Sequence, residues 1–243
     1  KNIRLACEQL NNTGFQPTDS CGLHVHIDLR DVKDNYIKLS RILRTFFAIE
    51  DVIFAMLPSS RLGNEYCEPL RYNYRFYDFY GRKVSKEFDC TIYNQKDKKI
   101  VNSYKREHGN SKRYMSCNFH STFYRGTLEV RAHNATQNPQ KILNWIELLL
   151  KITDWSLNHY HHSQVEELLK LDAGNSTLKK KVHKMQKMFK FSKKIENYIN
   201  QRIKKFHNEN LKISYSLGEQ PKRKKKWVDP NPCKETKTES GDC

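Results

Sequence analysis

The sequence lacks the features that mark several large classes of protein. It has no apolar run of about 18 residues, so we expect no transmembrane helix, and it does not start with the basic and apolar segments of a signal peptide. None of its seven cysteines belongs to a C-x-x-C pair. We therefore expect reduced, mostly buried thiols and no cysteine zinc site, in an intracellular protein of unknown compartment. Its nine glycines form no Gly-rich phosphate-binding loop.

The positive charge is concentrated in one part of the chain. The net charge is +17, and residues 178–227 contain 17 Lys and Arg against three acidic residues, a balance of +14. We predict an α+β domain over residues 1–163, a basic helical extension over 164–227 and a disordered tail over 228–243. The basic segment suits the phosphates of RNA or another polyanion. Alternatively, its helix packs an apolar stripe on the domain and its lysines only face solvent.

Hydrophobic periodicity predicts the order of the elements. Residues 33–57 have an apolar stripe with helical spacing that Pro58 ends, and Asn138 followed by Pro139 marks the start of a second long helix. Alternation of apolar and polar residues predicts strands over 21–30, 112–119 and 122–134. The order strand–helix–strand–strand–helix is typical of an α+β fold with an antiparallel sheet and helices on one face.

Two of these strands carry polar residues at every second position. They are His24, His26 and Asp28 in the first strand, and Arg125, Glu129, Arg131 and His133 in the strand 122–134. Because successive side chains of a strand point to opposite faces, one face of the sheet can bring these residues together. Carboxylates and imidazoles can bind a divalent cation, and arginines can hold phosphate or carboxylate. The alternative is a solvent-facing side of an antiparallel sheet that has no function.

Three separated segments occur in an order that points to one family. They are "CGLHVHIDLR" (21–30), "PSSRLGNEYCEPL" (58–70) and "RYMSCNFHSTFYRGTLEVRAHNATQNPQKILNWIELLLKI" (113–152). Together they resemble the amidoligase family, a branch of the glutamine-synthetase-like carboxylate–amine ligases. Glutamine synthetases have a comparable Gly-x-His-x-His strand and an acid-x-Arg strand followed by an Asn-Pro helix start. The resemblance covers roughly residues 1–158 and implies part of the glutamine-synthetase-like catalytic fold.

The resemblance also implies a chemistry and the residues that carry it. Members of this group use ATP and Mg²⁺ to convert a carboxylate, which is a poor electrophile, into an acyl phosphate that an amine attacks, giving an amide or isopeptide bond. His24 and Glu129 would be ligands of one metal ion, and Arg131 would face the substrate carboxylate or the transferred phosphate. Arg113 and Arg125 would lie on the phosphate side of ATP. His26 and Asp28 would lie on its nucleotide side.

One part of the family pattern has no counterpart in this sequence. The family begins with a Glu-x-Glu strand and a second acidic block, which supply most of the metal-binding carboxylates, and neither precedes Cys21 here. We therefore expect an upstream segment or a partner chain to complete the site of an active ligase. The alternative is a non-catalytic, amidoligase-like structural subunit of a larger assembly, whose basic region binds RNA or another polyanion.

Overall fold

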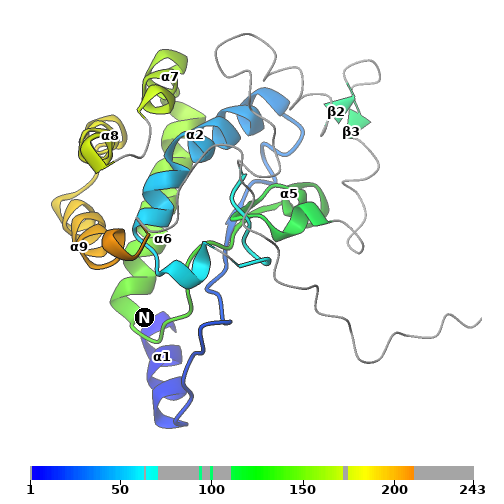
Figure 1. Ribbon diagram of the computed structural model, residues 1–243. Helices are drawn as coiled ribbons and strands as arrows, with labels where there is room; N and C mark the ends of the chain where they lie inside the picture. Colours follow the sequence, from blue (N-terminus) through cyan, green and yellow to red (C-terminus); the bar gives the residue numbers. More distant parts are fainter. Residues whose placement is uncertain are drawn as a thin grey trace, which may run out of the picture.

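A small antiparallel sheet packs against several long helices in this computed structural model, which describes residues 2–62, 64–70, 93–94, 99–100, 111–171 and 175–210 (Figure 1). The helices are α1 (Asn2–Asn12), α2 (Tyr36–Ala55), α5 (His120–Arg125), α6 (Pro139–Asn158), α7 (His162–Lys170), α8 (Asn175–Phe189) and α9 (Lys193–Asn210). Two 3₁₀ turns are η1 (Ser59–Arg61) and η3 (Ser111–Tyr114). The strands are β1 (Val25–Asp28), β2 (Tyr93–Asn94), β3 (Lys99–Ile100), β4 (Cys117–Asn118) and β5 (Thr127–Val130).

The main sheet joins segments that lie about a hundred residues apart in the sequence. Its strand order is β1-β5-β4, and both pairings are antiparallel. The register places His26 opposite Glu129 on one side of β5 and Asn118 opposite Glu129 on the other side. The predicted α+β fold with an antiparallel sheet is therefore confirmed, and the register makes β5 the centre of the sheet.

The predicted strand over residues 122–134 is wrong in its first part. Residues His120–Arg125 form helix α5, and the ladder of β5 covers only Thr127–Val130. Gly126 separates the two elements with a left-handed backbone conformation, φ 74°, and its N–H donates to Thr122 O. A glycine in this conformation ends a helix without steric cost, so the chain changes from helix to strand within one residue.

Replacing Gly126 with alanine is expected to lower the free energy of unfolding by about 2 kcal/mol. The new Cβ would clash with Arg30 Cγ, and the residue would keep a positive φ. Gly14→Ala is a matched control, because Gly14 also has a positive φ, 71°, but nothing lies within 4 Å of its Cβ position. Urea unfolding measures both variants, and equal losses would show that the crowding by Arg30 has no effect.

The predicted long helices are confirmed, with ends that their capping residues explain. Asn35 Oδ1 accepts from Lys38 N at the start of α2, and Asn138 Oδ1 accepts from Lys141 N at the start of α6, where Pro139 is the first residue. Both caps satisfy backbone N–H groups that have no partner within the helix. The two helices pack on each other and contribute many of the most buried side chains of the protein.

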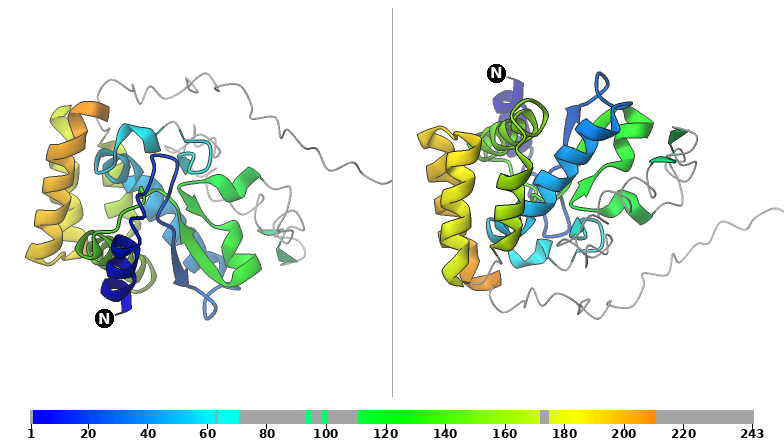
Figure 2. Two further views of the ribbon diagram at one scale, coloured as in Figure 1. Left: turned by 90° about the horizontal axis from the view of Figure 1, so that it is seen from below. Right: turned by 90° about the horizontal axis from the view of Figure 1, so that it is seen from above.

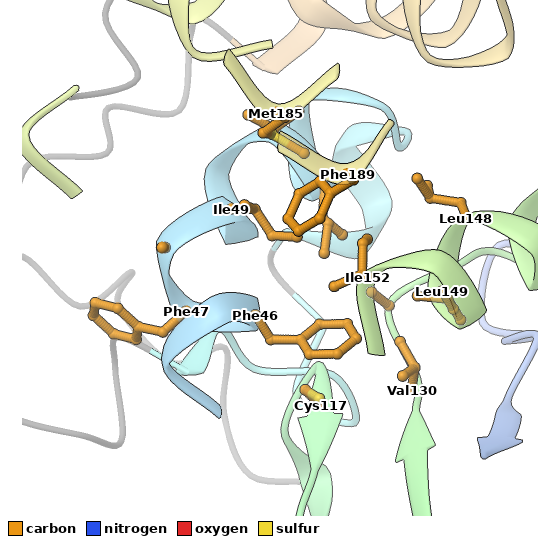
Figure 3. Close-up of a cluster of buried hydrophobic side chains, with 14 of the residues drawn as sticks. Phe46, Phe47, Ile49, Cys117, Val130, Leu148, Leu149, Ile152, Met185 and Phe189 are labelled. Atoms are coloured by element: carbon orange, nitrogen blue, oxygen red, sulfur yellow. The ribbon is translucent and has the colours of Figure 1, made fainter. Parts of the chain in front are cut away.

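The hydrophobic core lies between the sheet and α2, and it continues into the basic region. Phe46 of α2 packs near Cys117 and Val130 of the sheet, and Met185 and Phe189 of α8 lie on the other side of α2 (Figure 3). The apolar stripe of α8 and α9 joins the same core; its members include Leu178, Val182, Ile195 and Ile199. Figure 2 shows α8 and α9 at the end of the molecule away from the sheet.

Some lysines of α8 and α9 form ion pairs that hold these helices in place. Lys181 pairs with Asp51 of α2 at 2.6 Å, Lys184 pairs with Glu167 of α7, and Lys194 pairs with Glu147 of α6 at 2.6 Å. The boundary between residues 163 and 164 stays a prediction. The rest of the basic segment, 211–227, and the predicted disordered tail, 228–243, lie outside the described residues.

Two simpler predictions concern cysteines and membranes. Cys7, Cys67 and Cys117 are buried and Cys21 is half-buried, and all four are free cysteines in the described residues. The other three cysteines lie outside the described residues. Within the described part of the chain, every helix is too short or too polar to cross a bilayer.

Candidate functional site

Four polar side chains surround the carboxylate of Glu129 on one face of the sheet. We call these four, His24, His26, Asn118 and Arg131, together with Glu129 the Glu129 cluster. His24 Nδ1 lies 3.0 Å from Glu129 Oε1, and His26 Nε2 lies 3.7 Å from the same oxygen. His26 lies in β1 opposite Glu129 of β5, and His24, two residues earlier and just before β1, turns its ring to the same face.

Asn118 and Arg131 complete the contacts of the carboxylate. Asn118 Nδ2 donates to Glu129 Oε2 at 2.7 Å, and Arg131 Nη1 donates to Glu129 Oε1 at 2.8 Å. The amide of Asn118 is oriented by helix α5, because Ser121 N donates to Asn118 Oδ1 at 3.3 Å. Both carboxylate oxygens therefore accept hydrogen bonds, and the side chain of Glu129 is fixed on three sides.

The loop before residue 70 and the turn η3 hold the guanidinium of Arg131. Arg131 Nε donates to Tyr66 O at 2.9 Å, and its Cζ lies 5.7 Å from the centre of the Tyr114 ring. The side chain of Arg131 is 13% exposed. Arg131 is therefore a rigid cation at the edge of the cluster, with little freedom to follow a moving ligand.

His26 makes its closest contact with another residue of β5. His26 Nδ1 lies 2.9 Å from Thr127 Oγ1, which in turn lies 3.3 Å from Ser121 Oγ. His24 differs, because its Nδ1 faces Glu129 and its Nε2 has no partner among the described residues. The side chain of His24 is 36% exposed, so a ligand is able to reach its ring from solvent.

The carboxyl group of Glu129 has an unusually low pKa. Burial raises the pKa, but the hydrogen bonds from His24 and Asn118 and the charge of Arg131 outweigh burial and lower the pKa to about 2. Glu129 is therefore ionised throughout the ordinary pH range, and it offers a permanent negative charge to the ring of His24.

The contribution of Glu129 to stability is expected to disappear in acid. Its folded-state pKa of about 2 lies below the ordinary value of 4.5, so the contribution is complete above pH 4.5 and is lost as the pH falls towards 2. Between these limits we expect the free energy of unfolding of the wild type to fall by about 2 kcal/mol more than that of Glu129→Gln, after allowance for partial solvent screening. Urea unfolding at a series of pH values measures this difference. Parallel pH profiles of the two proteins would contradict it.

The structure places the other predicted residues outside the Glu129 cluster. The carboxylate of Asp28 is exposed and pairs with Arg30 at 2.6 Å; the Arg30 hydrogen bonds lower the pKa of Asp28 to about 2. Arg113 lies in η3 with its guanidinium 4.7 Å from the centre of the Tyr114 ring. Arg125 is the last residue of α5 and is exposed, so its predicted position on the polar face of a strand is wrong. The roles proposed for Asp28, Arg113 and Arg125 stay predictions.

His133 was also expected on the polar face, and this expectation is wrong. The residue is completely buried, with its ring 5.0 Å from that of Trp145 and its Nε2 3.3 Å from Tyr198 Oη. Burial, with the charges of Arg202 and Arg61, lowers the pKa of His133 to about 3. The ladder of β5 ends at Val130, so the alternation of the strand does not continue to residue 133.

Sequence reasoning missed two residues beside the cluster, Gly22 and Arg61. Arg61 is 2% exposed and donates to the carbonyl oxygens of Arg131 and Ala132, at 2.9 and 3.1 Å. A Cβ on Gly22 would lie 3.1 Å from His24 Nε2 and 3.2 Å from Arg61 Nη2. Both residues lie in segments that carry the family resemblance, but a buried arginine bound to backbone carbonyls has no periodicity by which a sequence pattern could reveal it.

The Glu129 cluster alone does not fit a magnesium ion. Mg²⁺ prefers about six oxygen ligands, whereas the cluster has one carboxylate, and its two oxygens already accept from His24, Arg131 and Asn118. The described ranges contain no group of three or more His, Cys, Asp or Glu side chains that is able to hold a metal ion. What the cluster does offer is a fixed carboxylate, a fixed guanidinium and one imidazole with a free nitrogen.

Comparison with known proteins identifies a family over more than half of the chain. A family model described as "Putative amidoligase enzyme" matches residues 1–153, which include every member of the Glu129 cluster. Searches of curated proteins and of solved structures found no match to the chain. The matched range ends within α6, before α7, α8 and α9 begin.

Proposed function

This chain belongs to the amidoligase family, and on that basis we propose that it takes part in the ATP- and Mg²⁺-dependent joining of a carboxylate to an amine. The Glu129 cluster would be the part of the catalytic site that the described residues supply. Further carboxylates for the metal would come from outside these residues, either from another segment or from a partner chain.

The observation that supports this proposal most strongly is the convergence of three segments on one carboxylate. The segment 21–30 contributes His24, the segment 113–131 contributes Asn118, Glu129 and Arg131, and the loop 64–68 contributes the Tyr66 carbonyl that holds Arg131. These three segments are the ones that resemble the family, and they lie far apart in the sequence. A solvent-facing sheet without a function needs no such convergence of charged and fully hydrogen-bonded side chains.

The chemistry of the cluster suits a reaction in which negative charge accumulates. ATP, when bound, would supply the phosphoryl group that turns a carboxylate into an acyl phosphate. Arg131 presents a positive charge that is already oriented by Tyr66 and Glu129, so little reorganisation is needed when an anionic group approaches. His24 presents a ring nitrogen that is able to accept a proton from an attacking amine or to bind a cation.

Trapping of an acyl phosphate tests the proposal without knowledge of the amine. The full chain is incubated with ATP, Mg²⁺, hydroxylamine and a panel of amino acids and short peptides, because hydroxylamine converts acyl phosphates into hydroxamates. We expect a hydroxamate to form with at least one carboxylate, together with an equal amount of ADP. If no member of the panel gives a hydroxamate above the level without protein, the ligase proposal is wrong for this chain.

No observation favours the alternative function, that of a non-catalytic subunit whose basic region binds RNA or another polyanion. Several of the lysines of α8 and α9 pair with acidic residues of α2, α6 and α7, as described above. Residues 211–227, which contain the densest basic run, lie outside the described residues. Polyanion binding by residues 178–227 therefore stays a prediction.

A further inference from the structure

A buried arginine lies directly beneath the Glu129 cluster, and its charge has no carboxylate partner in the described part of the chain. Arg61 ends the turn η1 and is 2% exposed. Its Nη2 donates to Arg131 O at 2.9 Å and its Nε donates to Ala132 O at 3.1 Å. Burial of a charged group without a counter-charge is costly, so a residue of this kind needs a compensating role.

The two carbonyls that Arg61 binds are consecutive in the chain, which reveals what the arginine does. In a regular strand, consecutive carbonyls point in opposite directions. Arg131 O and Ala132 O both accept from one guanidinium, and the ladder of β5 stops at Val130. Arg61 therefore holds the backbone at the point where the regular ladder of β5 is interrupted, before Leu23 N donates to His133 O at 2.9 Å, and this backbone carries the Arg131 side chain that reaches Glu129.

The same guanidinium and the His24 ring both lie against Gly22. A Cβ on Gly22 would lie 3.2 Å from Arg61 Nη2 and 3.1 Å from His24 Nε2. Contacts this short are tighter than ordinary van der Waals packing, so a side chain at residue 22 would displace the ring, the guanidinium or both by a few tenths of an ångström. Gly22 is joined to the far end of this segment by a bridge to Asn134 and is not in a left-handed conformation.

A second bond ties Arg61 itself to the loop that holds Arg131. Cys67 Sγ lies 3.1 Å from Arg61 O and donates to it. Burial raises the pKa of the Cys67 thiol to about 11, so the thiol keeps the proton that this bond requires. Arg61 is thus connected to Arg131 twice: directly through the backbone carbonyl, and through Cys67 and the loop that contains Tyr66.

From these contacts we propose that Arg61 is a positioning residue, which with Gly22 sets the geometry in which the His24 ring faces the Glu129 carboxylate. Arg61 fixes the backbone of Arg131 and thereby one side of Glu129, and Gly22 leaves room for both the guanidinium and the His24 ring on the other side. This proposal deepens the proposed function, because the cluster that Arg61 positions is the candidate catalytic site. Its test is nevertheless independent of catalysis.

The ring nitrogens of His24 report the geometry directly. Long-range ¹H–¹⁵N spectra of the full chain with ¹⁵N-labelled histidine distinguish the two neutral tautomers, and His24→Gln assigns the signals. A hydrogen bond to Glu129 favours the proton on Nδ1, so we expect this tautomer to dominate in the wild type. We expect Arg61→Met and Gly22→Ala each to change the tautomer ratio at least threefold, whereas Lys187→Met, which removes an exposed cation of α8, leaves the ratio unchanged.

Two further variants separate positioning from a loss of folding. Arg61→Lys keeps the charge but has one donor group at its end instead of a planar fork, so it is expected to restore only part of the wild-type ratio. Gly22→Ala decides the question if Arg61→Met does not fold, because alanine is compatible with the backbone at this position. An unchanged ratio in Gly22→Ala, and in Arg61→Met where it folds, would overturn the positioning role.

The hydroxamate assay on the same variants distinguishes this proposal from the ligase proposal. If the wild type forms hydroxamate, we expect kcat to fall at least tenfold in Gly22→Ala with little change in KM. If the wild type forms none but the tautomer ratio still responds to Gly22→Ala, the ligase proposal fails and the positioning role stands. If the wild type is active and the ratio does not respond, the positioning role fails and the ligase proposal stands.

Discussion

Replacing Glu129 with glutamine is expected to lower the rate of hydroxamate formation at least about a hundredfold. The substitution keeps the shape of the side chain and removes its charge. His24 Nδ1 then loses the carboxylate that orients its ring, and Arg131 Nη1 loses its ionic partner. The glutamine also presents an N–H group to one of the donors that now surround the carboxylate, so at least one of these contacts becomes repulsive.

A matched carboxylate elsewhere in the protein provides the control for this variant. Glu147 of α6 is also ionised and paired, with Lys194 at 2.6 Å, but it lies on a different element and belongs to no part of the cluster. Glu147→Gln should leave the rate within about twofold of the wild type, since a partly exposed pair contributes little. Thermal unfolding of both variants shows whether they are folded at the assay temperature. A folded Glu129→Gln protein with full activity would exclude Glu129 from the reaction.

Replacing Lys181 with methionine is expected to lower the free energy of unfolding by about 3–5 kcal/mol. The ammonium group lies 2.6 Å from Asp51 Oδ2, and the two side chains are 3% and 1% exposed. Removal of the lysine charge leaves the Asp51 carboxylate buried between α8 and α2, where water cannot solvate it. The loss is large because an unpaired buried charge costs more than the ion pair contributes.

The same helix supplies a control, and a double variant tests the reason. Lys184 pairs with Glu167 at the surface, so Lys184→Met should lower the free energy of unfolding by at most about 1 kcal/mol. The double variant Asp51→Leu and Lys181→Met removes both buried charges, and it should recover most of the stability that Lys181→Met loses. Urea unfolding measures all three. If the double variant is as unstable as the single one, the cause is lost packing and not the unpaired carboxylate.

The long helices were predictable because their signals are local. Asn138 and Pro139 mark the start of α6. The Asn138 side chain accepts the cap hydrogen bond from Lys141 N, only three residues further along the chain. Helix α5 was not predictable in this way. Its six residues alternate well enough to resemble a strand, and the decisive feature is the left-handed turn at Gly126, which a periodicity argument treats as one more strand position.

The residue types of the candidate site were predictable, but the contacts between these residues were only partly so. Alternation placed His24 and His26 on one face, and the family resemblance associated His24 with Glu129, which the structure places 3.0 Å from it. The contact with Asn118 was not foreseen, because it depends on the pairing of β4 with β5. The placement of Arg125 failed for the same reason as the strand prediction, since a helical residue no longer obeys the alternation of the sheet.

The properties that depend on neighbouring residues can be inferred from the amino-acid sequence alone: the helix caps, the apolar stripes, the shared face of His24 and His26, and the family. Which groups meet across long separations depends on the tertiary structure. The register of β1 on β5 places His26 opposite Glu129 and brings the preceding His24 within reach of its carboxylate, and the packing of η1 under the sheet brings Arg61 to the carbonyls of Arg131 and Ala132. Such contacts depend on the packing of the whole core around α2, and no single segment encodes them.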